Sequence, residues 1–221
     1  MAIEESSANF GPNICLSGGA DGADLMWGMC SGTAGHSVLH FSFAGHRSAV
    51  PPSEIVVLSD ELLREADPYL IKANKTMHRR FPSQSPHVNN LLRRNWYQVR
   101  DAESCYAVST IKDGIVQGGT SWAISLFQDR FDRGPCPAYV YCQEQGYWFE
   151  WTGEWTRIYE PPTPAGVWAG IGSRALNPGG KLAIRVLLNY QGVRDKHDVI
   201  LNDRKTSLAA IARLGPARYF L

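Results

Sequence analysis

The stretch Cys15-Leu16-Ser17-Gly18-Gly19-Ala20-Asp21-Gly22-Ala23-Asp24 joins a short apolar run to a segment with helical spacing. A strand that ends in a glycine turn and leads into a helix exposes backbone N–H groups, which bind phosphate favourably. Two further joints of this kind occur at Gln117-Gly118-Gly119-Thr120-Ser121 and at Gly170-Ile171-Gly172-Ser173-Arg174. In a doubly wound sheet ligands bind beyond the carboxyl ends of the strands, so the three joints predict one shared ligand site.

Strand and helix patterns alternate along the rest of the chain. Apolar runs predict strands at residues 13–16, 38–43, 104–108, 137–141 and 167–171. Helical spacing of apolar residues predicts helices at residues 23–30, 56–73, 89–102 and 179–188, and another after Thr120. Asp67-Pro68 is expected to divide the second of these helices into two. The alternation predicts an α/β fold of Rossmann-like type, with a parallel sheet and helices on both faces.

Residues 145–166 interrupt this alternation with a small aromatic β-hairpin and a proline connector. The aromatic runs at residues 147–151 and 155–159 flank Thr152-Gly153-Glu154, which suits a hairpin turn. The hairpin tryptophans would form a lid over the ligand or a self-association surface, which makes a homo-oligomer one expected partner. Residues 1–221 are expected to form a single domain, with a charged and then modestly helical tail at residues 191–221.

The composition favours a cytoplasmic globular protein. Lys and Arg number 22 against 21 for Asp and Glu, so the net charge of +1 gives nucleic acid little electrostatic attraction. No apolar run approaches the ~20 residues that span a bilayer, and the N-terminus is acidic and polar, unlike a secretory signal. The 5 cysteines include no C-x-x-C pair, which favours reduced thiols over disulfides or a zinc site.

Hydroxyl and guanidinium groups accompany the glycine joints. Ser17, Thr120 and Ser173 would add hydroxyl donors to the backbone N–H groups around a phosphate. Arg94 and Arg174 are the expected phosphate partners because guanidinium offers two parallel N–H donors. The alternative is that the joints are ordinary tight turns, which need glycine for steric reasons.

Two interpretations stay open for the acidic and amide residues nearby. Asp21 and Asp24 would each favour a helix N-terminus, worth ~0.5 kcal/mol. Asp24 could instead accept hydrogen bonds from a ribose or act as base or nucleophile at a sugar carbon, while Asn95 would bind a ribose or cap backbone. No histidine has metal-ligand spacing, and His46 is the one best placed for a role in the site. Nothing requires a metal or cofactor, although Mg²⁺ bound with a phosphate ligand is compatible with the sequence.

Four stretches of the chain share a pattern with one known family. Residues 17–24, Arg94-Asn95, Gly118-Gly119-Thr120 and Ile171-Gly172-Ser173-Arg174 resemble the S-G-G-A-x-G-x-D, R-N, G-G-T and G-S-R elements of the SLOG superfamily. This Rossmann-like superfamily contains DNA-processing protein A and the Lonely Guy proteins. Its G-S-R element precedes S-G-G-A, whereas here it comes last, so the chain resembles a circularly permuted member. The alternative is that the G-S-R match arises by chance.

The resemblance implies binding of a nucleotide or a nucleotide-derived ligand such as an ADP-ribose-like compound. Together with the joints, it predicts ligand contacts from Ser17, Gly18, Gly19, Ala20, Asp21, Arg94, Asn95, Gly118, Gly119, Thr120, Gly172, Ser173 and Arg174.

The resemblance leaves the chemistry open. Lonely Guy enzymes hydrolyse the N-glycosidic bond of a nucleoside monophosphate, and their signature P-G-G-x-G-T-x-x-E carries an assisting glutamate. The matching position here is Ser125, and Trp122 replaces the small threonine, so that catalytic apparatus is missing. Hydrolysis or transfer at this bond would need another carboxylate, for which Asp24 and Glu103 are the candidates. The alternatives are a non-catalytic sensor or sequestering protein and, third, a DNA-binding protein.

Overall fold

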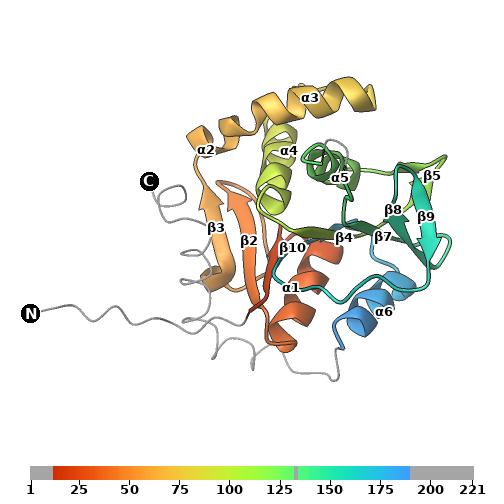
Figure 1. The fold of residues 1–221 in the computed structure, drawn as a ribbon. Coiled ribbons are helices and arrows are strands. Elements are labelled where there is room, and N and C mark those ends of the chain that lie inside the picture. Colours follow the sequence, from red (N-terminus) through yellow and green to blue (C-terminus); the bar gives the residue numbers. More distant parts are fainter. Residues whose placement is uncertain (1–11, 132–133, 190–221) are drawn as a thin grey trace, which may run out of the picture.

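An eight-stranded sheet forms the centre of the protein, with strands in the order β3-β2-β1-β10-β4-β7-β8-β9 (Figure 1). This computed structural model describes residues 12–131 and 134–189; the expected polar N-terminus and the tail at residues 191–221 lie outside them. The strands are β1 (Ile14–Ser17), β2 (Ser37–Phe43), β3 (Ile55–Leu58), β4 (Ser104–Ser109), β7 (Ala138–Cys142), β8 (Tyr147–Trp151), β9 (Trp155–Ile158) and β10 (Val167–Gly172). All neighbours from β3 to β7 pair in parallel, while β8 and β9 add antiparallel strands at one edge.

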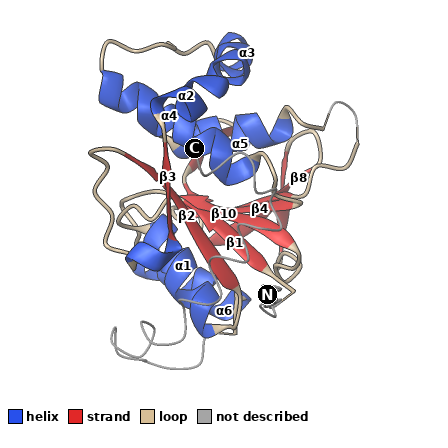
Figure 2. Cartoon of the chain, turned by 90° about the vertical axis from the view of Figure 1, so that its left-hand side faces the viewer, coloured by secondary structure: helices blue, strands red, loops and turns tan. Residues whose placement is uncertain are grey.

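Helices cover both faces of the sheet (Figure 2). α1 (Ala23–Thr33) and α6 (Pro178–Leu187) pack on one face, and α4 (Pro86–Val99) and α5 (Thr120–Gln128) pack on the other. α2 (Asp60–Glu65) contacts α4, and α3 (Asp67–Met77) contacts both α4 and α5. Because both faces are covered, every residue of β2 is buried. The predicted α/β class with a mostly parallel, helix-flanked sheet is confirmed.

The prediction of a helix at residues 56–73 is wrong for its first turn. Residues 55–58 form β3, which pairs in parallel with β2, and only then does α2 begin. Consecutive Ile55, Val56 and Val57 favour the extended chain, and the Ser59 side chain accepts a hydrogen bond from the N–H of Leu62 to cap α2. The expected division is confirmed, since α2 ends at Glu65 and α3 begins at Asp67.

Short elements that the sequence patterns did not predict complete the chain. A 3-10 turn, η1 (Pro52–Glu54), precedes β3, and a two-stranded ribbon of β5 (Ile111–Lys112) and β6 (Ile115–Val116) lies between β4 and α5. The ribbon returns the chain from the end of β4 to the middle glycine joint at residues 117–121, where the N–H of Gln117 donates to the Thr110 carbonyl oxygen at 2.9 Å.

The sheet order places a crevice between β10 and β4. After β10 the chain turns to α6 on one face of the sheet, whereas after β4 it continues to α5 on the other face. A crevice forms beyond the carboxyl ends of two neighbouring parallel strands when the chain leaves them towards opposite faces of the sheet. Ligands of doubly wound proteins bind in such crevices. The fold therefore indicates where a functional site should be sought.

Candidate functional site

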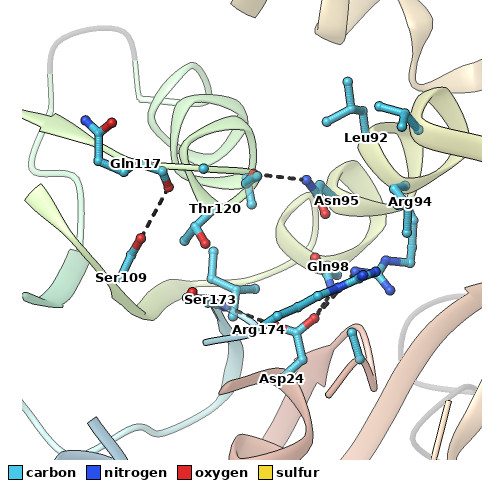
Figure 3. A pocket seen from close by; sticks show the side chains of 18 of the residues that line it. Asp24, Leu92, Arg94, Asn95, Gln98, Ser109, Gln117, Thr120, Ser173 and Arg174 are labelled. Carbon is cyan, nitrogen blue, oxygen red and sulfur yellow. Dashed lines mark hydrogen bonds and ion pairs between the residues drawn. The ribbon is translucent and has the colours of Figure 1, made fainter. Parts of the chain in front are cut away.

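A cavity of about 460 Å³ lies at this crevice, within the range of ~300–1,000 Å³ that is usual for small-molecule sites (Figure 3). We call it the strand-end cavity. Its walls come from α4, from the start of α1 and the turn before it, from the ends of β4 and β10, and from the start of α5. The lining residues are Ala20, Asp24, Val88, Leu91, Leu92, Arg94, Asn95, Gln98, Ser109, Thr110, Gln117, Gly118, Gly119, Thr120, Ala123, Ile171, Gly172, Ser173 and Arg174.

The first glycine joint supports the cavity more than it lines it. Ser17 is fully buried and its hydroxyl donates to the Gly170 carbonyl oxygen at 2.6 Å. A Cβ on Gly18 would lie 2.1 Å from the Gln98 side chain and 2.4 Å from that of Asp24, so glycine is needed for steric reasons. Of the predicted ligand contacts in this joint, Ala20 lines the cavity, whereas Ser17, Gly18, Gly19 and the exposed Asp21 do not.

The last glycine joint is bonded to the first. The N–H of Ala23, at the start of α1, donates to the Ser173 carbonyl oxygen at 3.0 Å. The N–H of Gly172 donates to Oδ1 of Asp24 at 3.0 Å, and the N–H of Ser173 donates to the Val108 carbonyl oxygen at 2.8 Å. These N–H groups are therefore already used. What this joint offers a ligand is the Arg174 side chain, which is exposed and lines the cavity.

The middle glycine joint, residues 117–121 at the start of α5, is open. Its helix has no side-chain cap, a property that it shares with α1 and α3, whereas the first turns of α2, α4 and α6 are capped by Ser59, Ser85 and Asn177. Among the residues that the structure describes, none accepts a hydrogen bond from the N–H of Gly119, Thr120 or Ser121. These donors and the positive end of the helix dipole therefore remain available to an anion.

Thr120 adds a side-chain donor at the same place. The residue is 7% exposed, and its hydroxyl makes no hydrogen bond to any residue in the described ranges. Figure 3 shows its side chain extending from the start of α5 towards Ser173. The hydroxyl is therefore free to donate to a ligand or a water in the cavity.

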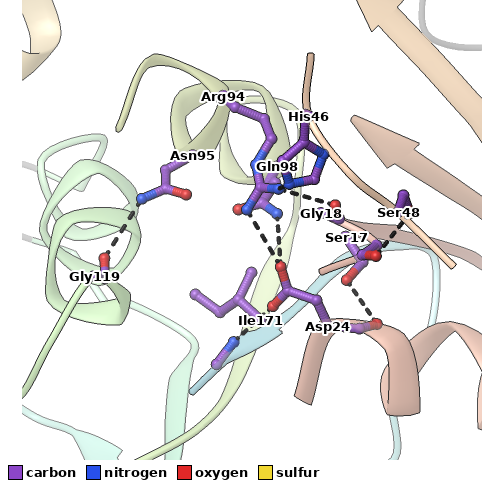
Figure 4. A network of polar contacts seen from close by, with 12 residues as sticks. Ser17, Gly18, Asp24, His46, Ser48, Arg94, Asn95, Gln98, Gly119 and Ile171 are labelled. Carbon is purple, nitrogen blue, oxygen red and sulfur yellow. Dashed lines mark hydrogen bonds and ion pairs between the residues drawn. The ribbon is translucent and has the colours of Figure 1, made fainter. Parts of the chain in front are cut away.

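A buried ion pair forms the floor of the strand-end cavity (Figure 4). Nη2 of Arg94 lies 3.5 Å from Oδ2 of Asp24, and the same oxygen accepts a hydrogen bond from Gln98 at 3.3 Å. Nη1 of Arg94 donates to the Gly18 carbonyl oxygen at 2.9 Å, while its Nε has no partner among the described residues. Burial raises the pKa of Asp24, and the nearby Arg94 guanidinium opposes that rise. Arg94 therefore holds the Asp24 carboxylate as well as lining the cavity.

His46 extends this network as a neutral ring. Its Nε2 lies 2.9 Å from Nη1 of Arg94, and its Nδ1 lies 3.0 Å from the Ser42 hydroxyl. Because guanidinium only donates, Nε2 must accept and the ring proton must sit on Nδ1. Burial, followed by the charges of Arg94 and Arg174, lowers the pKa of His46 to about 4. The sequence singled out His46 for a role in the site; the structure places it in contact with Arg94 but not in the cavity lining.

We expect the free energy of unfolding to fall as the pH drops from about 6.5 towards 4. Burial also lowers the pKa of His40 to about 4. Between about pH 6.5 and 4, His40 and His46 therefore bind protons in the unfolded chain but stay neutral in the folded protein. The slope of the free energy of unfolding against pH should reach about 1.4 kcal/mol per pH unit from buried His40. The contribution of His46 should be smaller, because solvent partly screens this ring. Asp24 has the opposite effect at the acidic end of this pH range: because its pKa is raised in the folded protein, its protonation favours the folded state as the pH falls.

Urea unfolding at pH 7.5, 6 and 5, together with NMR titration of the histidine ring protons, measures this effect. A free energy of unfolding that stays constant from pH 7 to 5, or a His46 ring that titrates above pH 6, would contradict the burial argument.

Glu103, the other candidate carboxylate, is not part of the site. It precedes β4, and its N–H donates to the Val167 carbonyl oxygen at the start of β10, whereas the cavity lies at the far ends of these strands. Its side chain is instead close to Gly166, where a Cβ would lie 2.3 Å from a carboxylate oxygen of Glu103. The structure therefore does not place Glu103 with the other predicted site residues. The aromatic strands β8 and β9 also contribute no residue to the cavity, so they are not a lid over it.

The remaining predicted residues are brought together as expected. Asn95, Gly118, Gly119, Thr120, Gly172, Ser173 and Arg174 all line the strand-end cavity. The sequence patterns missed Gln98, Ser109 and Thr110, and the apolar wall of Val88, Leu91 and Leu92. The spacing of Leu91, Asn95 and Gln98 on one helical face could have indicated the α4 wall, but no sequence signal marks which face meets a ligand.

Comparison with known protein families, curated proteins and solved structures gives no match to this chain. The helices in the described ranges are too short or too polar to cross a bilayer. Within the same ranges, no group of three or more His, Cys, Asp and Glu side chains is placed to hold a metal ion.

Proposed function

We propose that the strand-end cavity binds the phosphate of a nucleotide or of a nucleotide-derived molecule. The start of α5 carries this proposal, because the free backbone N–H groups of Gly119 and Thr120 and the unpaired Thr120 hydroxyl are presented together at the cavity wall, with the free N–H of Ser121 next to them. Helix N-termini of this kind bind phosphate through N–H donors and the helix dipole. The exposed Arg174 guanidinium, across the cavity, supplies a positive charge for the same group.

The rest of the cavity suits the other parts of a nucleotide. Val88, Leu91 and Leu92 offer an apolar surface to a flat base. Asn95 and Gln98, on the same helix, are amides that can bind sugar hydroxyls. A simple inorganic anion would leave this wall of α4 without a partner. The combination of an anion site, amides and an apolar wall therefore supports a nucleotide-like ligand.

The strand order supports the proposed relationship to a permuted SLOG-type sheet. If the chain were read from β10, the strands would run outwards as β10-β1-β2-β3 on one side and β4-β7-β8-β9 on the other. β10 pairs with β1 from Ile14↔Val167 to Leu16↔Ala169, so strands from the two ends of the described chain are neighbours. Such an arrangement is the expected product of a circular permutation.

Replacing Arg174 with alanine is expected to lower ligand affinity at least about tenfold, because a charge-assisted hydrogen bond is lost. The melting temperature should not change, since the side chain is exposed. The measurement is calorimetric titration with AMP, GMP, CMP and UMP. Arg64→Ala, which removes an exposed arginine of α2, is the matched control. Equal affinity of the Arg174→Ala and Arg64→Ala variants would remove Arg174 from the site.

A second candidate function is hydrolysis or transfer at the N-glycosidic bond of the ligand. One observation favours it: Asp24, the one carboxylate among the lining residues, is buried and has a raised pKa, a combination common at catalytic sites. Its oxygens, however, already accept hydrogen bonds from Gly172, Gln98 and Arg94. This engagement favours binding without catalysis.

Product analysis decides between the two functions. After incubation with each nucleoside monophosphate, chromatography would detect free base and sugar phosphate if the bond is hydrolysed. Loss of these products in Asp24→Asn, with binding retained, would assign catalysis to Asp24. A ligand recovered intact would support a sensor or sequestering protein.

A further inference from the structure

We propose that Arg79, which belongs to none of the glycine joints, is a positioning residue for the start of α5. It lies between α3 and α4, and its Nη1 donates to the carbonyl oxygen of Gly118 at 3.0 Å. By holding this carbonyl, Arg79 keeps the neighbouring N–H groups in the orientation that receives the ligand. The inference rests on the proposed function, because it assigns Arg79 to the same site.

Packing does not hold the glycine turn in place. Gly118 has a φ of 70°, and a Cβ built on Gly118 or on Gly119 would meet no heavy atom within 4 Å. Both glycines are exposed. A turn of two glycines in open space has many accessible backbone conformations, so contacts from elsewhere must select one.

Hydrogen bonds to the two carbonyl oxygens supply that selection. The Gly118 oxygen accepts from Arg79 and also from the Ser121 hydroxyl at 2.8 Å. The Gly119 oxygen accepts from the N–H of Trp122 at 3.1 Å and from the Asn95 side chain at 3.4 Å. Ser121 and Trp122 belong to α5 itself and move with the turn. Arg79 and Asn95 come from other segments and tie the turn to the rest of the protein.

Fixing a carbonyl oxygen also fixes an N–H group. The C=O of Gly118 and the N–H of Gly119 belong to one planar trans peptide and therefore point in opposite directions. While Arg79 holds the oxygen, the Gly119 N–H points away from it and stays free of any described acceptor. Without Arg79, the Ser121 hydroxyl would be the one described donor left to this oxygen, and the peptide would be held less firmly in the orientation that presents its N–H to a phosphate.

One side chain points independently to a ligand at this place. The Thr120 hydroxyl, on a residue that is 7% exposed, makes no hydrogen bond to a described residue. The start of α5 is therefore more than a bare helix N-terminus.

The test compares Arg79→Gln with Arg80→Gln. Both variants remove one exposed arginine from the same segment, but no hydrogen bond of Arg80 to a described residue is present. In calorimetric titration with the nucleoside monophosphates, Arg79→Gln should weaken binding about fivefold or more, and Arg80→Gln less than about twofold. Arg79→Lys, which keeps one donor and the charge, should recover part of the loss. The melting temperature should stay the same in all three variants.

A readout without ligand separates positioning from simple charge attraction. In ¹H–¹⁵N spectra of the free protein, the Gly119 amide resonance should move in Arg79→Gln and remain in place in Arg80→Gln. If the wild type binds a nucleotide and the two variants bind it equally, the inference about Arg79 is overturned while the proposed function stands. If the wild type binds none of the four nucleotides, the proposed function fails and the inference falls with it.

Discussion

Replacing Arg94 with methionine is expected to lower the free energy of unfolding by about 3–5 kcal/mol. Arg94 and Asp24 are each only 5% exposed, and their side chains form an ion pair at 3.5 Å. Methionine keeps much of the side-chain volume but leaves the Asp24 carboxylate buried without its cation. The Gly18 carbonyl oxygen also loses a donor. Urea unfolding of the variant measures the effect.

The neighbouring residue provides a matched control. Arg93 makes a bidentate ion pair with Asp67, but both side chains are partly exposed, so Arg93→Met should cost about 1 kcal/mol or less. Adding Asp24→Asn to Arg94→Met should recover part of the lost stability, because the unpaired buried charge is removed. A loss in Arg94→Met no larger than that in Arg93→Met would show that the Asp24–Arg94 pair does not stabilise the fold.

Replacing Gly22 with alanine is expected to lower the free energy of unfolding by about 3 kcal/mol or more. Gly22 has a φ of 98°, which side chains other than that of glycine rarely allow. An added Cβ would also lie 2.4 Å from the carbonyl oxygen of Arg174 and 2.5 Å from that of Ser173. These atoms are backbone and cannot rotate away. The variant would therefore separate the first and last glycine joints, which thermal or urea unfolding would detect.

Gly35→Ala separates the two causes. Gly35 also has a positive φ, 83°, but a Cβ there would meet nothing within 4 Å. Its replacement should cost only the backbone strain, about 1 kcal/mol. Similar losses at both positions would mean that the close approach of Gly22 to residues 173–174 contributes nothing.

Local patterns predicted most of the fold. The strand runs ending at Leu16, at Val108 and at Ile171 were each found within one or two residues, because buried parallel strands read as continuous apolar runs. The patterns failed at residues 56–58, where valine and leucine fit either a strand or a helix. These residues form a strand because they pair with β2, and local sequence does not reveal that contact.

The candidate site was predictable only in part, because the glycine joints look alike in sequence and differ in their partners. Gly172 donates to Asp24, 148 positions away, and its N–H is thereby used. Gly119 has no such partner among the described residues and stays open. Arg94 was expected to bind phosphate, yet it is largely engaged by Asp24 and Gly18. Arg79 gave no signal at all, since its role depends on its contact with Gly118 across 39 positions.

The central claim is that the start of α5 receives the phosphate of a nucleotide-like ligand. The most direct measurement is a ¹H–¹⁵N titration of the protein with AMP, GMP, CMP and UMP. We predict that one or more of these nucleotides shifts the backbone amides of Gly119, Thr120 and Ser121 most strongly, since these N–H groups would donate to the phosphate. Unchanged resonances at these amides with all four nucleotides, or shifts confined to residues outside the strand-end cavity, would contradict the claim.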